Sequence, residues 1–480
     1  MARPTRVAWT ASGALVAVGA VAIGGFAAGA ARHTGRDAPA GKALVRSHET
    51  SATAERSGQN SRDASTPIKA GGSAPDSASS ATTADVSISA GDIEALVAAH
   101  SAALKSKNRA AFIAGFDTKH PDLALHEGQL FDNLRKIPLT TASYSVGTVS
   151  GSGATATAIV TFIHQITGVD SVPVVERYKW TVQRTAANGP LEVVAVSGAP
   201  AEHNYPAPWD AVASLTVLAK PKVVIMADDS SASFAKSHAT ALESDAEYDL
   251  SHWTGGPGTA PGFAVFLTAD RARYEGIYSQ DRAESVGVTV PIAAAGNTGA
   301  TGDTENTSGF YPSSRIAVDT TQYKNLAAAD ADIVFKHEMA HAMIGPFDDQ
   351  NAASGQNHLW VIEGFAEWES QRMYSTADLL YNGVSLHAYL AKHGIPTALP
   401  TDSQVYSANA DVSGLGYFYS HMAMRYMAAK YSPAKVDQFV LYVYKHATGS
   451  TCVDDAMKNV LETTTVQFTQ GFEKWLRSSV

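Results

Sequence analysis

Two histidines and a glutamate in residues 336–341, Lys-His-Glu-Met-Ala-His, have a spacing that suits metal binding on a helix. Residues four positions apart lie on one face of a helix, so His337 and His341 can reach the same ion. Glu338 then projects beside that ion and can accept a proton from water. The pattern predicts a metal site that activates a water molecule.

A catalytic zinc ion keeps three protein ligands and one open position, so two histidines alone are incomplete. Glu363 lies 22 residues after His341 (363 − 341), which leaves room for a turn and a second helix. Gly345-Pro346 is expected to end the first helix, and the polar segment 347–358 to form the loop. A second helix restarts at Leu359. We expect Glu363 to complete a Zn²⁺ site.

Glu367 lies one helical turn after Glu363 and can reach the same region without binding the ion. We interpret it as an outer carboxylate that fixes the ring orientation of one histidine. A glutamate on a helix is more commonly solvated or paired with a cation. The spacing alone leaves both interpretations open.

The segment 360–368, Trp-Val-Ile-Glu-Gly-Phe-Ala-Glu-Trp, taken with the histidine motif, resembles the gluzincin class of zinc metallopeptidases. In that class H-E-x-x-H is followed by a glutamate ligand on the next helix, often within W-L-x-E-G-x-A-x-Y. The resemblance implies that His337, His341 and Glu363 are ligands and that Glu338 is the general base. It also implies a mixed sheet lobe before the metal helix and an all-helical lobe after it.

Some gluzincins carry a tyrosine on a later helix that stabilises the tetrahedral intermediate, in a pattern similar to Y-x-x-G/S. Residues 416–420, Gly-Tyr-Phe-Tyr-Ser, match this pattern loosely. Tyr417 is therefore our second catalytic candidate, with Tyr419 as its nearest rival and aromatic core packing as the alternative for both. His421 follows one turn later and could face the same cleft, but a single histidine on a helix is more often structural.

The best-known gluzincin aminopeptidases hold the substrate's amino terminus with a G-x-M-E-N segment. Residues 302–306, Gly-Asp-Thr-Glu-Asn, lack the methionine, and we treat this match as coincidence. The sequence therefore favours an endopeptidase that acts on peptide or protein substrates. The alternative is a non-catalytic extracytoplasmic binding or sensing protein that retains a structural zinc.

Composition excludes two other classes of function. The 480 residues carry a formal net charge of −10, which gives no basic surface for nucleic acid. The single cysteine, Cys452, cannot form a disulfide within the chain, and nothing near it suggests thiol catalysis. Stability must therefore come from core packing.

The amino terminus predicts the location of the protein. Arg3 and Arg6 precede an uncharged, mostly apolar run over 7–31, which suits an export signal or a membrane anchor. The run is long enough for one membrane span, yet residues 28–30, Ala-Gly-Ala, resemble a cleavage site. Both interpretations of 1–32 place the catalytic part outside the cytoplasm, secreted or attached to the membrane.

Three further segments follow. Residues 33–85 are rich in Ser, Ala and Thr and predict a disordered tether. Residues 86–204 combine a helical pattern over 93–104 with four strand-like stretches, which predicts an accessory α+β domain, faintly similar to nuclear transport factor 2-like domains. Tyr205-Pro-Ala-Pro marks the start of a zinc metallopeptidase domain over 205–480.

The fold class expected for the whole chain is α+β. Within the second domain we expect strands at 223–227, 263–267 and 316–318, a helix at 232–253, a loop at 294–314, and helices almost throughout after Leu359.

Overall fold

The computed structural model describes residues 86–479 with the exception of short internal segments. These segments are 118, 152, 188, 200–203, 280–284, 296–310, 348–357, 382–383 and 447–450. The predicted signal or anchor, the predicted tether and most of the predicted loops at 294–314 and 347–358 therefore lie outside the described residues. No helix within the described part is long and apolar enough to cross a membrane.

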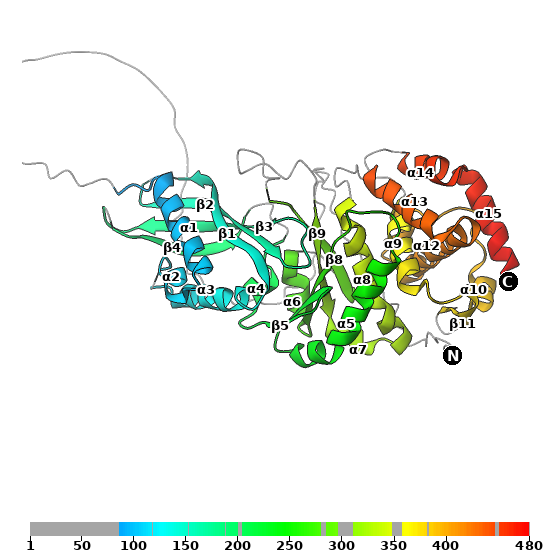
Figure 1. Cartoon of the computed structure of the whole chain (residues 1–480), viewed down its shortest axis with the longest axis horizontal. Coiled ribbons are helices and arrows are strands. Elements are labelled where there is room, and N and C mark those ends of the chain that lie inside the picture. Colours follow the sequence, from blue (N-terminus) through cyan, green and yellow to red (C-terminus); the bar gives the residue numbers. More distant parts are fainter. Residues whose placement is uncertain are drawn as a thin grey trace, which may run out of the picture. The chain divides into compact units, whose positions relative to one another are not determined.

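Three helices precede a four-stranded antiparallel sheet in the first part of the described chain (Figure 1). The helices are α1 (Ala90–Lys105), α2 (Arg109–Ile113) and α3 (Pro121–Leu134). The strands follow in the order β1 (Leu139–Ser150), β2 (Thr155–Ile166), β3 (Val174–Arg184) and β4 (Leu191–Gly198). This mixed α/β composition confirms the expected helix and strand pattern. The division into domains stays a prediction.

A second, five-stranded sheet follows, with strand order β5-β6-β7-β9-β8. Its strands are β5 (Thr216–Ala219), β6 (Val223–Ala227), β7 (Phe263–Thr268), β8 (Gly287–Ile292) and β9 (Ser313–Asp319). The central strands β6, β7 and β9 are parallel, and the edge strands β5 and β8 are antiparallel. The three predicted strands are confirmed. Strands β5 and β8 were not predicted, and the predicted loop was wrong at Ser313 and Ser314, which begin β9.

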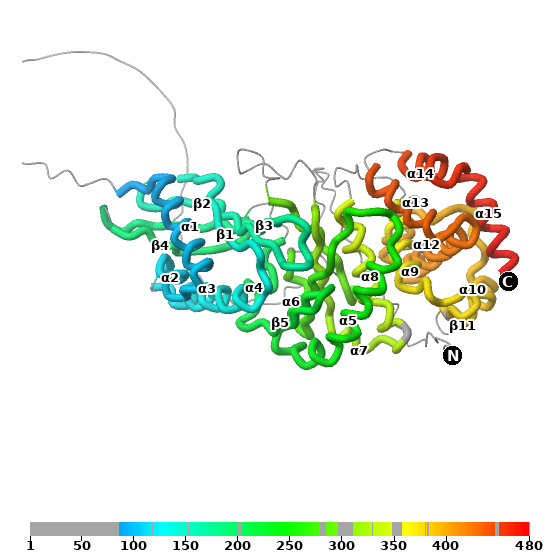
Figure 2. Tube along the Cα trace, in the orientation of Figure 1, coloured from blue at the N-terminus to red at the C-terminus, as the bar shows by residue number. Residues whose placement is uncertain are grey.

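Helices accompany the second sheet and lead into the site. They are α4 (Pro208–Ala211), α5 (Ala232–His252), α6 (Arg271–Gly276), α7 (Thr320–Asn325) and α8 (Ala328–Ile344), with short 3₁₀ turns at Ile277–Ser279 and Gly345–Phe347. Along the chain β9 is followed by α7 and α8, which are labelled in the middle part of the trace in Figure 2. Both α5 and α8 pack on this sheet with apolar side chains such as Leu242 and Met339.

The two sheets are joined by a buried ion pair and by backbone hydrogen bonds. Arg315 of β9 donates to both carboxylate oxygens of Asp170, at 2.7 and 3.0 Å, and both side chains are almost fully buried. The backbone N–H of Val175 donates to the carbonyl of Ala293, directly after β8. The residue that follows edge strand β8 therefore contacts the first sheet.

The remaining chain is mainly helical. Its helices are α9 (Leu359–Gln371), α10 (Leu386–His393), α11 (Asp402–Val405), α12 (Ala410–Lys430), α13 (Pro433–Lys445), α14 (Cys452–Leu461) and α15 (Thr465–Ser478), with a 3₁₀ turn at Thr376–Asp378. A two-stranded hairpin of β10 (Leu380–Tyr381) and β11 (Val384–Ser385) interrupts them. The expectation of an all-helical lobe is therefore wrong for these residues. Their backbone groups pair between two short antiparallel strands instead of within a helix.

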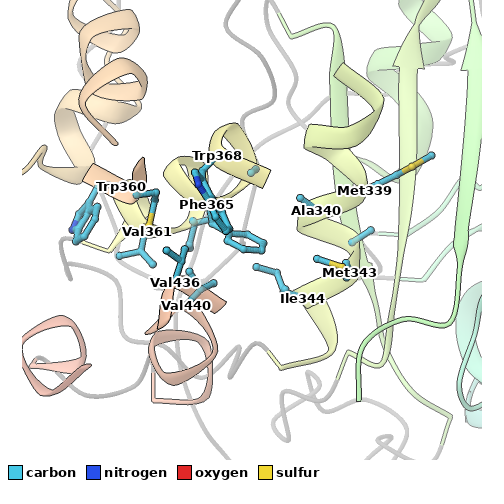
Figure 3. Packing of buried hydrophobic residues seen from close by; sticks show 14 of the residues in the cluster. Met339, Ala340, Met343, Ile344, Trp360, Val361, Phe365, Trp368, Val436 and Val440 are labelled. Carbon is cyan, nitrogen blue, oxygen red and sulfur yellow. The ribbon is translucent and has the colours of Figure 1, made fainter. Parts of the chain in front are cut away.

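A common apolar core holds α8 and α9 in place. Figure 3 shows the side chains of both helices with Val436 and Val440 of α13 beside α9. Apolar residues of α8 and α9 in this core are Met339, Ala340, Met343, Ile344, Trp360, Val361, Phe365 and Trp368. Burial of such side chains contributes about 1.5–3 kcal/mol each, so the two helices are rigid supports for their polar residues.

Candidate metal centre

Two consecutive long helices provide the candidate ligands. The predicted end of the first helix is confirmed, since α8 stops at Ile344 and a 3₁₀ turn begins at Gly345. The second helix begins at Leu359, as predicted. His337 and His341 lie on α8 and Glu363 lies on α9, and all three are buried. The loop between the helices lies mostly outside the described residues.

The three donor atoms form a compact triangle. Nε2 of His337 and Nε2 of His341 lie 3.1 Å apart. Oε2 of Glu363 lies 3.4 Å from each of these nitrogens. Ligand atoms that surround a tetrahedral ion at about 2.0–2.2 Å are separated by about 3.3–3.6 Å. The triangle therefore has the size of one face of such a coordination shell.

Unpartnered polar atoms support the same conclusion. Oε2 of Glu363 is buried and has no hydrogen-bond partner among the described residues. Burying a charged oxygen without a partner is costly, which is the usual situation of a ligand atom considered without its ion. The group of His337, His341 and Glu363 could hold a metal ion, and no other such group of three is found within the described part of the chain.

Tyr406 fixes the orientation of the Glu363 carboxylate. Its hydroxyl donates to Oε1 at 2.5 Å, so the two oxygens have different roles. Oε1 accepts this hydrogen bond, and Oε2 faces the imidazoles. Although 36% of the surface of Tyr406 is exposed, its polar end points at a fully buried carboxylate. This arrangement favours ligation through one oxygen.

Charge complementarity holds the same group together. Burial alone would raise the pKa of Glu363, but the neighbouring His341 and His337 outweigh it and lower the pKa to about 2. Burial likewise opposes a charge on His337, yet Glu363 and Glu367 raise its pKa to about 10. Two carboxylates thus favour positive charge at the position of the His337 imidazole, as a cation site requires.

Glu367 lies behind the first histidine. Its Oε1 is 3.4 Å from Nδ1 of His337, on the side of the ring away from Nε2. Its Oε2 accepts a hydrogen bond from the side chain of Gln371 at 2.8 Å. This placement suits the predicted outer carboxylate, whose role in orienting the ring stays a prediction.

Glu338 is buried beside the ligands without belonging to the donor triangle. Its Oε2 accepts a hydrogen bond of 2.7 Å from the hydroxyl of Thr289 in β8. Its Oε1 has no hydrogen-bond partner among the described residues. Burial raises the pKa of Glu338, which favours the protonated form more than in water. When deprotonated, Glu338 is therefore a stronger base than an exposed glutamate.

Of the two candidate tyrosines, Tyr417 faces the site. Burial, followed by the charge of the nearby Glu363, raises the pKa of its phenol. Tyr419 points elsewhere and donates to the carbonyl of Gly394 at 3.1 Å. The geometry therefore favours Tyr417 over Tyr419.

His421 is enclosed by structural partners instead of facing the donor atoms. Its Nε2 lies 2.8 Å from Nε of Arg425, and its Nδ1 lies 2.9 Å from the hydroxyl of Tyr381. Because a guanidinium group can only donate, Nε2 of His421 accepts and the ring is neutral. This agrees with its pKa, which burial and Arg425 lower.

Gly364, inside the glutamate motif, allows two helices to approach closely. A Cβ at this position would lie 2.7 Å from the backbone oxygen of Ser420 on α12. Any larger residue would push α12 away from α9. The glycine therefore helps to bring Tyr417, on α12, close to Glu363.

Two residues beside the candidate site, Tyr406 and Thr289, were not predicted from the sequence. Tyr406 follows the short helix α11 and carries no recognisable motif. Thr289 belongs to β8, whose sequence Gly-Val-Thr-Val-Pro-Ile alternates valine with other residues and could have indicated a strand. The contact of Thr289 with Glu338 could not have been predicted from this pattern.

Comparison of this chain with protein-family models, with curated proteins and with solved structures gives no match.

Proposed function

We propose that this chain is a zinc-dependent hydrolase of peptide bonds. The observation that carries the proposal is the position of Glu338, a buried carboxylate with a free Oε1, directly beside a donor set that excludes it. A purely structural metal site has no need of such a neighbour, since its ligands close the coordination shell. The likeness of the two motifs to those of gluzincins supports the same activity.

Zinc is the ion that this donor set favours. Two imidazole nitrogens and one carboxylate oxygen suit zinc, whereas calcium and magnesium prefer oxygen ligands throughout. Three protein ligands leave a position for water or substrate. A bound zinc ion supplies Lewis acidity, which polarises a carbonyl group and lowers the pKa of nearby water.

The protein's own residues provide the proton transfer and the charge stabilisation. Glu338 takes a proton from the attacking water at Oε1 and returns it to the leaving amine. Its raised pKa suits a carboxylate that holds the proton between these two steps. The hydroxyl of Tyr417 donates a hydrogen bond to the carbonyl oxygen as negative charge develops there.

The proposed substrates are peptides or proteins outside the cytoplasm. The absence of a G-x-M-E-N segment favours internal cleavage over removal of amino-terminal residues. The sequence of 1–32 supports export, with the hydrolase secreted or held at the membrane. The part formed by 86–204 is then an accessory to the hydrolase.

The test uses the purified zinc-loaded protein and a library of peptides from a digested proteome. The wild type should cleave the peptides, and a chelator should stop it. Glu338→Gln should bind zinc as tightly as the wild type and lose about 10²–10⁴-fold in rate. The exposed Glu247 on α5 provides the control, and Glu247→Gln should keep full activity.

Two results would contradict the proposal. An active Glu338→Gln variant would exclude Glu338 as the base. A wild type that binds zinc but cleaves no peptide would favour the alternative, a binding or sensing protein with a structural zinc.

A further inference from the structure

Strand β8, at the edge of the second sheet, places two residues against the side chain of Glu338. The hydroxyl of Thr289 lies 2.7 Å from Oε2 and 2.9 Å from the backbone oxygen of Glu338. Gly287 shares a face of the strand with Thr289, because side chains alternate along a strand. A Cβ at Gly287 would lie 2.9 Å from both Cγ and Oε1 of Glu338. Strand β8 thus bonds to Oε2 through Thr289 and leaves space beside Oε1 at Gly287.

These contacts distinguish the two oxygens of Glu338. A threonine hydroxyl carries one hydrogen, and a carboxylate oxygen is a stronger acceptor than a peptide carbonyl. The hydrogen of Thr289 therefore goes mainly to Oε2. Oε1 is buried and has no hydrogen-bond partner among the described residues. Oε1 is consequently the oxygen that remains free to take up a proton.

Space filling does not account for a threonine at this position. Val288 and Val290 point to the other face of β8 and belong to the core that the second sheet shares with the first. On the face toward Glu338, a valine at 289 would occupy nearly the same volume as the threonine. The property that only the threonine has is its hydroxyl group.

We propose that Thr289 is a positioning residue of the hydrolytic site: its hydroxyl holds Glu338 through Oε2, so that Oε1 stays free for proton transfer. Gly287 leaves the space that Oε1 needs. The inference rests on the proposed function, in which Glu338 is the general base. Thr289 acts through Glu338 and does not itself touch the substrate.

The test compares Thr289→Val and Thr289→Ser in the zinc-loaded full chain, with the peptide that the wild type cleaves fastest. Thr289→Val should lower kcat by about 10–100-fold, the usual effect of losing an orienting hydrogen bond, and change KM by less than about twofold. Thr289→Ser keeps the hydroxyl and should restore most of kcat. Zinc affinity should be equal in all three proteins.

A second readout is independent of activity. In a crystal structure of the zinc-loaded Thr289→Val variant, the Glu338 carboxylate should occupy a different rotamer from that of the wild type. Gly287→Ala is a second variant for the same claim, because its Cβ would displace Oε1 directly. It should also move the carboxylate and lower kcat while leaving zinc bound.

Thr268 provides a matched control. It lies in β7 of the same sheet, and its buried hydroxyl donates to Oδ2 of Asp228 at 2.6 Å. Thr268→Val should therefore lose a comparable amount of stability, about 1–3 kcal/mol, and keep its kcat. This separates the effect on catalysis from the general cost of removing a buried hydrogen bond.

The inference is overturned if Thr289→Val has the same kcat as Thr268→Val. It is also overturned if Thr289→Ser has a kcat as low as that of Thr289→Val. A wild type without peptidase activity would instead remove the proposed function. The crystal structures then decide the positioning claim alone: an unmoved Glu338 in both Thr289→Val and Gly287→Ala would refute it, and a displaced carboxylate would support it.

Discussion

The hydroxyl of Tyr406 donates a 2.5 Å hydrogen bond to Oε1 of Glu363, while Oε2 of the same carboxylate lies 3.4 Å from Nε2 of both His337 and His341. Hydrogen-bonded support of a ligating carboxylate typically contributes 10–100-fold to metal affinity. We therefore expect Tyr406→Phe to weaken zinc binding by about 10-fold or more.

Competition with a chromophoric chelator would measure this change. Tyr419→Phe is the control, since that hydroxyl donates to the carbonyl of Gly394 and not to a ligand. Equal zinc affinities for Tyr406→Phe and Tyr419→Phe would show that Tyr406 does not support the site.

Tyr417→Phe should act on turnover more than on metal content. Its phenol is on α12 near Glu363, whose charge helps to raise the phenol's pKa, and losing one donor to a developing oxyanion costs about 10²–10³-fold in kcat. Single-turnover rates together with zinc analysis would check this. An effect of the same size in Tyr419→Phe would contradict the assignment.

Zinc removal should lower the thermal stability of the protein. The ligands lie on two helices, α8 and α9, so a bound ion cross-links them and stabilises the folded state. At free zinc of about 1,000 times Kd the gain is about 4 kcal/mol.

Differential scanning calorimetry of metal-free protein with added zinc, magnesium or calcium would test both the gain and the selectivity. Zinc should raise Tm strongly, and the other two ions should have little effect. His341→Ala should abolish the zinc response. An equal response to calcium would contradict the nitrogen-rich donor set.

The pair of Arg315 and Asp170 should stabilise the contact between the two sheets. Both side chains are buried, and Asp170 also accepts from Ser313 and from the backbone N–H of Ile166. Removing one member of a buried pair leaves the other charge unpaired, which costs about 3–5 kcal/mol. Arg315→Ala should lower the free energy of unfolding by this amount in urea denaturation. The double variant Arg315→Met, Asp170→Leu removes the unpaired charge but also the acceptor of Ser313 and Ile166, so it should recover only part of the loss. A larger loss in the double variant would contradict this account.

His100 should make stability depend on pH. Burial among aromatic rings lowers its pKa to about 3, from 6.5 for a free histidine, although a hydrogen bond with the carbonyl of Phe112 opposes the shift. The unfolded chain therefore binds a proton more readily than the folded one. This contribution is complete above about pH 6.5 and is lost as the pH falls from 6.5 toward 3.

Between pH 7 and pH 5 the loss from this one group is about 2 kcal/mol. Urea denaturation at both pH values should show that His100→Phe loses less stability over this interval than the wild type, even if it is less stable at pH 7. His164 also has a pKa lowered to about 3 and is present in both proteins, so its effect cancels. Equal losses in the two proteins would contradict a neutral His100.

Local periodicity predicted the elements that carry the candidate ligands. The i, i+4 spacing of His337 and His341, with Gly345-Pro346 as the helix stop, was sufficient to place both histidines on one face of one helix. Glu363 and Glu367 are positioned by the same rule on the next helix. Such features depend on neighbours within a few residues, so they can be read directly from the sequence.

The partners of the candidate base and of the carboxylate ligand depend on the tertiary structure. Thr289 reaches Glu338 because an edge strand 49 residues earlier packs against α8, and Tyr406 reaches Glu363 across 43 residues. No local pattern encodes these approaches, because they follow from how the sheet, α8, α9 and α12 pack around one core. The sequence by itself determined which residues could bind a metal ion, and the packing of distant segments decided which oxygen of each carboxylate is left free.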